Sequence, residues 1–380
     1  MVKRVLKTVF AVIFLMVFGT CSSPDNGEGV LSLSFAPNPE SRYLVDTGTE
    51  LSNMVYAVTF TRQGETVTKE FSGSSANISL AAGKWTVSIR AIGNTPAIYN
   101  TKYKDEDDYL PAVLFPNRML RGMSDEVEVE IKTGKKTDQT IKMVTATEVT
   151  SYYQAMRATM CVNDSGKEEI LLISENMKFD FNDPYTNDEG DTVSDHGANI
   201  SYTKNIRIIA DKPITLSRGK NCDMPLLRVD GTLTLGGYGM KGSLTFDGSY
   251  TAAPETDTIF YVAPGGTLTM NDRVTLTGNN TDSSGSGVRV LEGTFTMNGG
   301  EIKNNSSASS GGGVFVMEGT LDKKGGTIYG TGSEFQNTAG FGYAVDASYP
   351  SIGKYQYLNT TSGPNDILFI DGTTTVGNWE

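Results

Sequence analysis

Apolar and polar residues alternate over short runs between Val30 and about Val144, as in VLSLSF, MVYAVTFTR and WTVSIRAI. A period of two indicates strands with one face against a core and the other face in water. This half of the chain predicts an antiparallel β-sandwich of about seven strands over residues 30–145. The run SLAAGKWTVSIRAI predicts a central strand with three apolar side chains on its buried face: Trp85, Val87 and Ile89.

The pattern changes near Thr147, where TEVTSYYQAMRATMCV has helical spacing. Thr150 or Ser151 is a candidate N-cap. The positions that share one helical face are Tyr153, Met156 and Met160. We expect a short amphipathic helix that closes the hydrophobic end of the strands that follow, because an open strand edge favours aggregation.

Four later segments share one phrase: LLRVDGTLTLGG, IFYVAPGGTLTMND, GVRVLEGTFTMNGG and GVFVMEGTLDKKGG. Their Gly-Thr pairs begin at residues 231, 266, 293 and 319, which gives spacings of 35, 27 and 26. A repeat of this length predicts a stacked architecture. No repeat has the helical period of a helical solenoid, and a propeller blade needs about 40 residues. The sequence therefore predicts a parallel β-helix over residues 148–375, with coils about 4.8 Å apart.

A shift of 26 residues superimposes similar residues, and we expect each pair to lie one above the other. The apolar pairs are Val288 with Val314, Val290 with Val316, Phe295 with Leu321, and Ile302 with Ile328; the others are Gly293 with Gly319, Gly299 with Gly325, and Asn279 with Asn305. The apolar pairs predict interior columns, and the asparagines predict a hydrogen-bonded ladder.

With its repeated GT-T-GG-I-N coils, the second half resembles the right-handed parallel β-helix of pectin-lyase-like proteins. This resemblance implies an all-β fold. It leaves activity open, because the fold carries polysaccharide lyases, hydrolases and adhesins that catalyse nothing. The first half resembles the Ig-like or transthyretin-like modules of bacterial surface lipoproteins.

The first seven residues include three basic ones, Lys3, Arg4 and Lys7, and an uncharged apolar run follows them. This layout is typical of a secretory signal and too short to span a bilayer comfortably. Residues 1–20 resemble a bacterial lipoprotein signal, which implies lipidation of Cys21, a tether over residues 21–29 and attachment to the cell envelope, at the outer membrane and facing outward. An ordinary signal peptide with an incidental cysteine is the alternative.

The net charge is −12, and loss of residues 1–20, with three basic residues and no acidic one, would make it −15. An acidic surface repels phosphate backbones, so we expect no nucleic-acid partner. Cys161 and Cys222 would then remain, either as a disulfide or as two buried thiols.

The only histidine, His196, lies in an acidic loop, NDPYTNDEGDTVSDHG. Its carboxylates are candidate calcium ligands: Asp183, Asp188, Glu189, Asp191 and Asp195. The spacing does not match an EF-hand, and a solvated acidic loop is the alternative. The acidic insertion at residues 105–108 has the same two interpretations, a cation site or a solvated loop. GYGMKG matches a dinucleotide fingerprint, but a strand follows it rather than a helix, so we expect no cofactor there.

If the chain were a lyase, the resemblance would imply acidic calcium ligands and a basic residue on one outward sheet. The candidates in the coils are Asp247, Asp257, Asp272, Arg273, Arg289, Glu292, Lys303 and Glu318. Glu292 and Glu318 lie one coil apart and are candidates for a coupled acidic pair or a shared cation. No catalytic motif of the family is present, so we assign no catalytic residue.

The C-terminal segment FGYAVDASYPSIGKYQYLN is rich in tyrosine. Exposed tyrosines would offer flat platforms to a sugar or a protein, and the alternative is that they close the end of the β-helix. The candidates are Tyr343, Tyr349, Tyr355 and Tyr357. We expect a lipid-anchored, non-catalytic surface protein that serves adhesion or recognition of a glycan or host ligand. The alternatives are a polysaccharide lyase or glycoside hydrolase, and an envelope scaffold.

Overall fold

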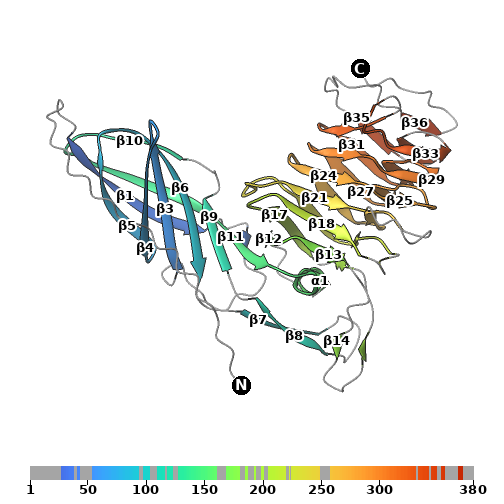
Figure 1. Cartoon of the computed structure of the whole chain (residues 1–380), viewed down its shortest axis with the longest axis horizontal. Helices are drawn as coiled ribbons and strands as arrows, with labels where there is room; N and C mark the ends of the chain where they lie inside the picture. Colours follow the sequence, from blue (N-terminus) through green and yellow to red (C-terminus); the bar gives the residue numbers. More distant parts are fainter. Residues whose placement is uncertain are drawn as a thin grey trace.

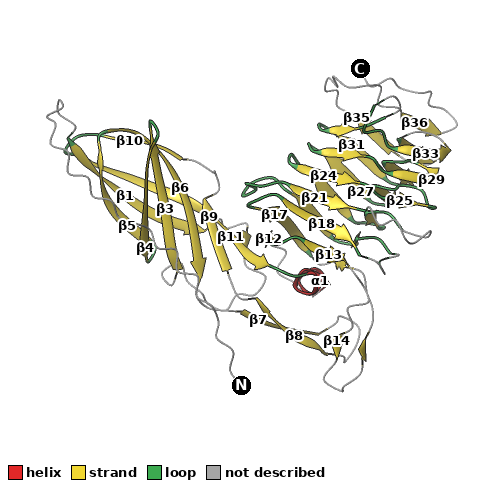
Figure 2. Cartoon of the chain, viewed as in Figure 1, coloured by secondary structure: helices red, strands yellow, loops and turns green. Residues whose placement is uncertain are grey.

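The structure is a computed structural model of the whole chain. It describes residues 27–37, 41–42, 54–93, 97–102, 109–115, 118–122, 127–160, 168–179, 185–186, 192–193, 198–200, 204–219, 222, 224–248, 257–330, 333–341, 344–348, 352–355 and 367–370. Within these ranges the fold is all-β apart from one short helix, and it includes several parallel sheets (Figures 1 and 2).

Eleven described strands precede the helix. They are β1 (Glu28–Pro37), β2 (Ser41–Arg42), β3 (Met54–Arg62), β4 (Glu65–Ser72), β5 (Ser75–Ala81), β6 (Gly83–Gly93), β7 (Ala97–Lys102), β8 (Tyr109–Phe115), β9 (Arg118–Gly122), β10 (Val127–Ile131) and β11 (Lys136–Val149). β7 and β8 form a sheet of their own, and the other nine belong to one large sheet system.

The strand expected to be central is β6. It pairs with β3, β9 and β10, all antiparallel. Trp85, Val87 and Ile89 are buried on one face, as predicted, in a core shared with β1, β3, β5, β10 and β11. The alternating sequence therefore predicted the buried face of this strand correctly.

Among the pairings that these eleven strands make with one another, one is not antiparallel. β1 runs parallel to β11, with eight paired residues from Val30 with Lys136 to Pro37 with Met143. Parallel neighbours need a long connection, and the intervening chain that forms the other strands provides it. The expectation of a purely antiparallel sandwich was therefore wrong at this pair.

After the helix, most strands belong to three parallel sheets. Sheet I contains β12 (Glu168–Ile173), β17 (Asn205–Ala210), β20 (Thr232–Leu235), β23 (Thr267–Met270), β27 (Thr294–Met297), β31 (Thr320–Lys323) and β35 (Ile352–Tyr355). Sheet II contains β13 (Met177–Phe179), β18 (Ile214–Arg218), β21 (Leu244–Asp247), β24 (Val274–Thr277), β28 (Glu301–Lys303) and β32 (Thr327–Ile328). Sheet III contains β16 (Ala198–Ile200), β19 (Leu227–Val229), β22 (Phe260–Val262), β26 (Val288–Leu291), β30 (Val314–Met317), β34 (Val345–Ser348) and β36 (Ile367–Ile370).

Two small sheets complete the strands of this half. Sheet IV contains β25 (Asn280–Thr281), β29 (Ser306–Ser310) and β33 (Thr338–Phe341), which are also parallel. β14 (Tyr185–Thr186) and β15 (Thr192–Val193) pair with each other. From β16 to β35 the chain passes repeatedly through sheets III, I and II in that order, so successive passes lie side by side in Figure 1. We call sheets I to IV the parallel stack.

The predicted register of the parallel stack is confirmed. Val288 pairs with Val314, Phe295 with Leu321, and Ile302 with Ile328. All six side chains are buried in one continuous apolar core that runs through sheets I, II and III. Each turn of chain therefore provides the template on which the next turn packs.

The predicted asparagine ladder is also present. The backbone N–H of Asn279 donates to the Asn305 side-chain oxygen at 3.1 Å, and the backbone N–H of Asn305 donates to Asn337 at 3.1 Å. The glycine pairs are close as well, because a Cβ on Gly319 would lie 2.8 Å from the Gly293 carbonyl oxygen. No other residue fits this turn without displacing the neighbouring backbone.

The helix α1 (Tyr152–Met160) lies beside the first strands of the stack. Ser151 is its N-cap, since its hydroxyl accepts the backbone N–H of Gln154 at 3.3 Å. The Tyr152 ring packs 4.8 Å from that of Phe179, in the first strand of sheet II. The side chains of the predicted apolar face, Tyr153, Met156 and Met160, lie outside the described residues. In the described part of the chain, no helix has the length and apolar character that a membrane crossing requires.

β11 connects the two halves without a linker. It pairs with β1 and β9 on the N-terminal side and with β12, the first strand of sheet I, at its end. Met143 belongs to the N-terminal core, whereas the next residue, Val144, belongs to the core of the stack. Adjacent residues of a strand point to opposite faces, so one strand contributes to both cores.

Candidate functional site

Four planar side chains project outward from consecutive strands of sheet III. Arg228 pairs with Tyr261, Tyr261 with Arg289, and Arg289 with Phe315. Their neighbours on each strand point into the core, whereas these four are not buried. We call them the planar column. Consecutive members are one strand apart, about 4.8 Å.

Arg228 is held flat at the first end of the column. Its Nε lies 3.0 Å from both carboxylate oxygens of Asp230, and its Nη2 lies 2.8 Å from one of them. The guanidinium carbon lies 5.2 Å from the centre of the Tyr261 ring. This geometry gives a cation–π contact and leaves Arg228 with 45% of its side chain exposed.

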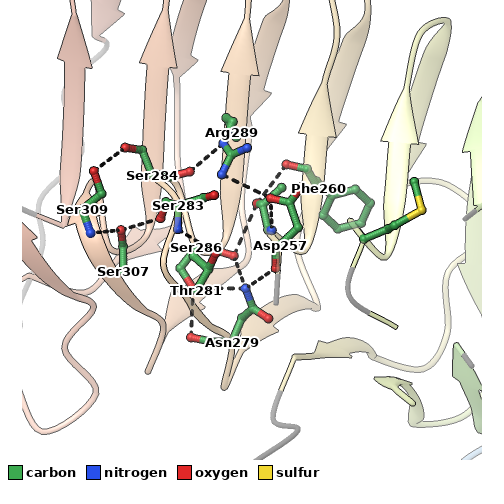
Figure 3. Close-up of polar contacts among 12 residues, drawn as sticks. Asp257, Phe260, Asn279, Thr281, Ser283, Ser284, Ser286, Arg289, Ser307 and Ser309 are labelled. Carbon is green, nitrogen blue, oxygen red and sulfur yellow. Dashed lines mark hydrogen bonds and ion pairs between the residues drawn. The ribbon is translucent and has the colours of Figure 1, made fainter. Parts of the chain in front are cut away.

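Arg289 is held by one group in the loop that leads into its own strand and by one group in the preceding turn, as Figure 3 shows. Its Nε donates to the Ser284 carbonyl oxygen at 2.7 Å, and its Nη2 lies 3.2 Å from Asp257. Nη2 makes no aligned hydrogen bond, so the pairing with Asp257 is electrostatic. Asp257 in turn accepts the backbone N–H of Thr258 at 2.7 Å.

The turns beside Arg289 are fixed by serine hydroxyls (Figure 3). Ser284 and Ser309 lie 3.0 Å apart through their side-chain oxygens, and Ser307 donates to the Ser283 carbonyl oxygen at 2.7 Å. The carbonyl that orients Arg289 therefore belongs to a turn that is bonded to the next one. A preorganised site requires such support, because a mobile guanidinium would lose entropy on binding.

Glu292 and Glu318 lie beside the column, in the turns that lead from sheet III to sheet I. Each follows a pair of residues in register, Leu291 with Met317, so the two glutamates occupy equivalent positions one turn apart. Both are exposed and both have a left-handed backbone, with φ of 51° and 54°. The equivalent residue one turn earlier, Gly265, also has positive φ. The structure thus places the two predicted glutamates at equivalent positions in successive turns. The repeated turn conformation explains this placement without a bound ligand.

The other charged residues expected of a lyase are spread over several faces. Asp247 and Lys303 lie on sheet II, in one outward column, whereas Asp272 and Arg273 lie in a turn between sheets I and II. Lys303 contacts Glu301 at 2.5 Å. Of the candidates, the structure brings together only Asp257 with Arg289 and Glu292 with Glu318. Within the described ranges, no three acidic, histidine or cysteine side chains gather as a metal site would require.

Several predicted sites lie outside the described residues. They are the signal segment 1–20, Cys21, the acidic insertion 105–108, Cys161, His196 and its loop carboxylates Asp183, Asp188, Glu189, Asp191 and Asp195, and the tyrosines Tyr343, Tyr349 and Tyr357. The backbone of Tyr355 is described, and it pairs with Lys323 at the end of sheet I.

Cys222 is a buried thiol. Its sulfur and its carbonyl oxygen both accept hydrogen bonds from Arg218, at 3.4 and 2.9 Å. Arg218 also donates to the Asn279 side chain at 3.2 Å, which extends the asparagine ladder toward the first turns. Cys222 therefore has a packing role in the core.

A second polar cluster lies near the start of sheet I. Arg207 donates to Glu168 at 2.8 Å, and its guanidinium carbon lies 4.2 Å from the centre of the Tyr238 ring. The Tyr238 hydroxyl donates to the other oxygen of Glu168. Burial and the Glu168 carboxylate raise the pKa of Tyr238 to about 12. Tyr238 belongs to GYGMKG, and the strand β21 follows this motif, as predicted.

The planar column was not recognised from the sequence, although its signal is present there. Aligning the repeated phrases as LRVDGT, FYVAPGGT, VRVLEGT and VFVMEGT places Arg, Tyr, Arg and Phe at one position. Each residue precedes a buried valine, so it must point outward. Comparison of the chain with protein families, curated proteins and solved structures found no match.

Proposed function

We propose that this chain is a non-catalytic recognition protein that binds a neutral glycan along the planar column. The observation that supports this proposal most is the row of four outward planar groups on consecutive strands of one sheet. Tyr261 and Phe315 are two strands apart, about 9.6 Å, a spacing on the scale of a sugar repeat. Aromatic faces suit the apolar face of a sugar ring, and many weak contacts along a polymer add up.

The charges beside the column favour a neutral ligand over an acidic one. Each guanidinium faces its own carboxylate, Arg228 with Asp230 and Arg289 with Asp257. The exposed Glu292 and Glu318 add negative charge nearby, and the chain carries a net charge of −12. A polyanion would be repelled. Sugar hydroxyls, by contrast, would donate to these carboxylates.

The wider architecture is part of the same proposal. We take the parallel stack to be a right-handed parallel β-helix of the pectin-lyase-like type, over residues 148–375. The repeated order of sheets III, I and II supports this reading. The N-terminal strands would be an Ig-like spacer over residues 30–145, and the signal segment with Cys21 would attach the protein to the outer membrane by lipid.

A binding assay with the chain from residue 22 onward tests the proposal. The ligands are neutral polysaccharides, with uronic-acid and sulfated polymers for comparison. We expect Tyr261→Ala and Phe315→Ala each to weaken binding to the neutral polymer by about tenfold or more, because each removes one stacking face. The matched control is Phe341→Ala, since Phe341 is 73% exposed but lies on sheet IV. Thermal unfolding of each variant checks its fold.

The alternatives predict other results. A lyase would release unsaturated product from a uronic-acid polymer, with or without calcium. An envelope scaffold would bind none of the polymers. Loss of binding in Phe341→Ala with none in Tyr261→Ala would move the site to the C-terminal end, where the tyrosine-rich segment lies.

A further inference from the structure

We propose that the parallel pair β1–β11 is a mechanical joint, which passes tension from an N-terminal attachment into the parallel stack without unfolding the N-terminal strands. The proposal rests on the proposed function, in which the chain is anchored at one end and holds a ligand with the stack. Tension would then enter at the start of β1 and leave at the end of β11.

The direction of the two strands determines how they resist this tension. β1 and β11 are parallel over eight residue pairs, from Val30 with Lys136 to Pro37 with Met143. Tension acts on the N-terminal end of β1, at Glu28, and on the C-terminal end of β11, at Val149. Because the two strands are parallel, these opposite forces shear one strand past the other. Every hydrogen bond of the pair is then strained together. In a hairpin opened from its end, the bonds would break one at a time.

β1 is held on both edges. Its other edge pairs with β5 over seven residues, from Glu28 with Ala81 to Ser34 with Ser75. The start of β1 is fixed as well, because the Val30 N–H donates to the Lys135 carbonyl oxygen at 2.9 Å and Gly134 donates to that of Glu28 at 2.8 Å. Extraction of β1 therefore breaks two rows of hydrogen bonds at once.

The inner face of the joint is apolar and sealed. The side chains that β1 and β11 bury together are Leu31, Leu33, Phe35, Ile141 and Met143. The Phe35 ring stacks on that of Tyr56, with centres 4.2 Å apart. Sliding by even one residue would turn this set toward the solvent, since side chains alternate between the two faces of a strand. Packing therefore opposes the same motion as the hydrogen bonds.

No flexible segment separates the joint from the stack. β11 continues past Met143 to Val149 and pairs there with β12, from Thr147 with Leu171 to Val149 with Ile173. Val144, Ala146 and Val149 are buried in the core of the stack. Tension that reaches β11 is therefore delivered directly to the first strand of sheet I.

Single-molecule pulling between residue 22 and the C-terminus tests the proposal, and it needs no ligand. Ser34 and Thr140 face each other across the joint, with side-chain oxygens 2.8 Å apart. The matched pair away from the joint is Thr59 with Thr68, on β3 and β4, at 3.0 Å. We would compare Ser34→Cys with Thr140→Cys against Thr59→Cys with Thr68→Cys, each oxidised and then reduced, with the disulfide located by peptide mapping.

In the unmodified chain, unfolding of the N-terminal strands should release an extension on the order of 400 Å. The oxidised Ser34–Thr140 disulfide should shorten this step by about 350 Å and reduction should restore it, which identifies the step as that of the N-terminal strands. The oxidised Thr59–Thr68 disulfide should keep the unfolding force and shorten the step by about 30 Å, since it encloses few residues. The joint predicts that, in the unmodified chain, the step of the N-terminal strands needs a higher force than the steps of the parallel stack. An N-terminal step at a lower force than those of the stack, or a lowered force in the Thr59–Thr68 variant, would overturn the joint. Neither result depends on glycan binding, which the polysaccharide assay measures separately.

Discussion

The side-chain amide of Asn305 donates a hydrogen bond to the side-chain oxygen of Asn337 at 2.9 Å, although 32 residues separate them. The same amide donates to the carbonyl oxygens of Leu276 and Lys303, at 3.2 and 3.0 Å. Asn305 thus satisfies polar groups of three successive turns inside the stack. A buried polar group that lacks such partners is costly.

Replacement of Asn305 by alanine should therefore lower the free energy of unfolding by about 2–4 kcal/mol, because several buried polar groups lose their partner at once. Denaturant unfolding measures this loss. Asn298→Ala is the matched control, since Asn298 is exposed and donates to Asn271 at 3.1 Å. We expect its effect to stay within about 0.5 kcal/mol. Equal losses in the two variants would mean that the ladder is not buried.

Glu292 and Glu318 have a left-handed backbone conformation, and replacing either residue by glycine should stabilise the chain. Glu292→Gly and Glu318→Gly each remove a side chain from a conformation that costs an L-residue about 1–2 kcal/mol. Part of this gain is offset by the greater freedom of glycine in the unfolded chain, so we expect about 0.5–1 kcal/mol each.

The control is Thr296→Gly, because Thr296 lies on the extended strand β27 and glycine should destabilise the chain there by about 1 kcal/mol. Thermal unfolding compares the three variants. A drop in stability at both glutamates would show that their carboxylates make a contact worth more than the backbone conformation costs.

Lys323 should make stability depend on pH. It occupies a core position that Met270 and Met297 fill in the two preceding strands, and only 3% of it is exposed. Burial lowers the pKa of its amine below the ordinary 10.5, and the group donates to the Gly326 carbonyl oxygen at 2.9 Å.

Because the unfolded chain then binds the proton more tightly, the contribution of Lys323 to stability increases as the pH rises toward 10.5. The difference in unfolding free energy between the wild type and Lys323→Met should therefore shift in favour of the wild type from neutral pH to pH 10.5. Denaturant titrations of both proteins at several pH values measure this difference. A constant difference would contradict the lowered pKa.

The stack was predictable where the repeat is regular and less so elsewhere. The 26-residue spacing gave the register of Val288 with Val314 because equal spacing brings equal residues together. The next turn is longer, with 32 residues from Asn305 to Asn337 in place of the 26 from Asn279 to Asn305. An insertion at a turn breaks the period without breaking the stack, so the 26-residue spacing could not predict the register of Val314 with Val345.

The parallel pairing of β1 with β11 could not be predicted from the sequence. Alternation predicted the buried face of β1, which includes Leu31 and Leu33, but it carries no information on which strand lies beside which. The parallel pairing and the passage of β11 into the second core depend on contacts between distant segments. Among the site residues, Arg289 and Asp257 were predicted as candidates from their charge. Tyr261 and Phe315 were not predicted, because only the register of the strands places them in one column.

Oxidative cross-linking between β29 and β33, across the longer turn, tests whether successive turns pack in register. Both the planar column and the parallel stack depend on this register. Ser306 pairs with Thr338, and their side-chain oxygens lie 3.0 Å apart. A chain with Ser306→Cys and Thr338→Cys should form a disulfide readily, found by peptide mapping. The control combines Ala308→Cys with Thr338→Cys, two residues out of register and about 8 Å apart, which is beyond disulfide reach. Rapid cross-linking of the first pair alone is the expected result, and equal rates for both pairs, or cross-linking of the control alone, would contradict the packing.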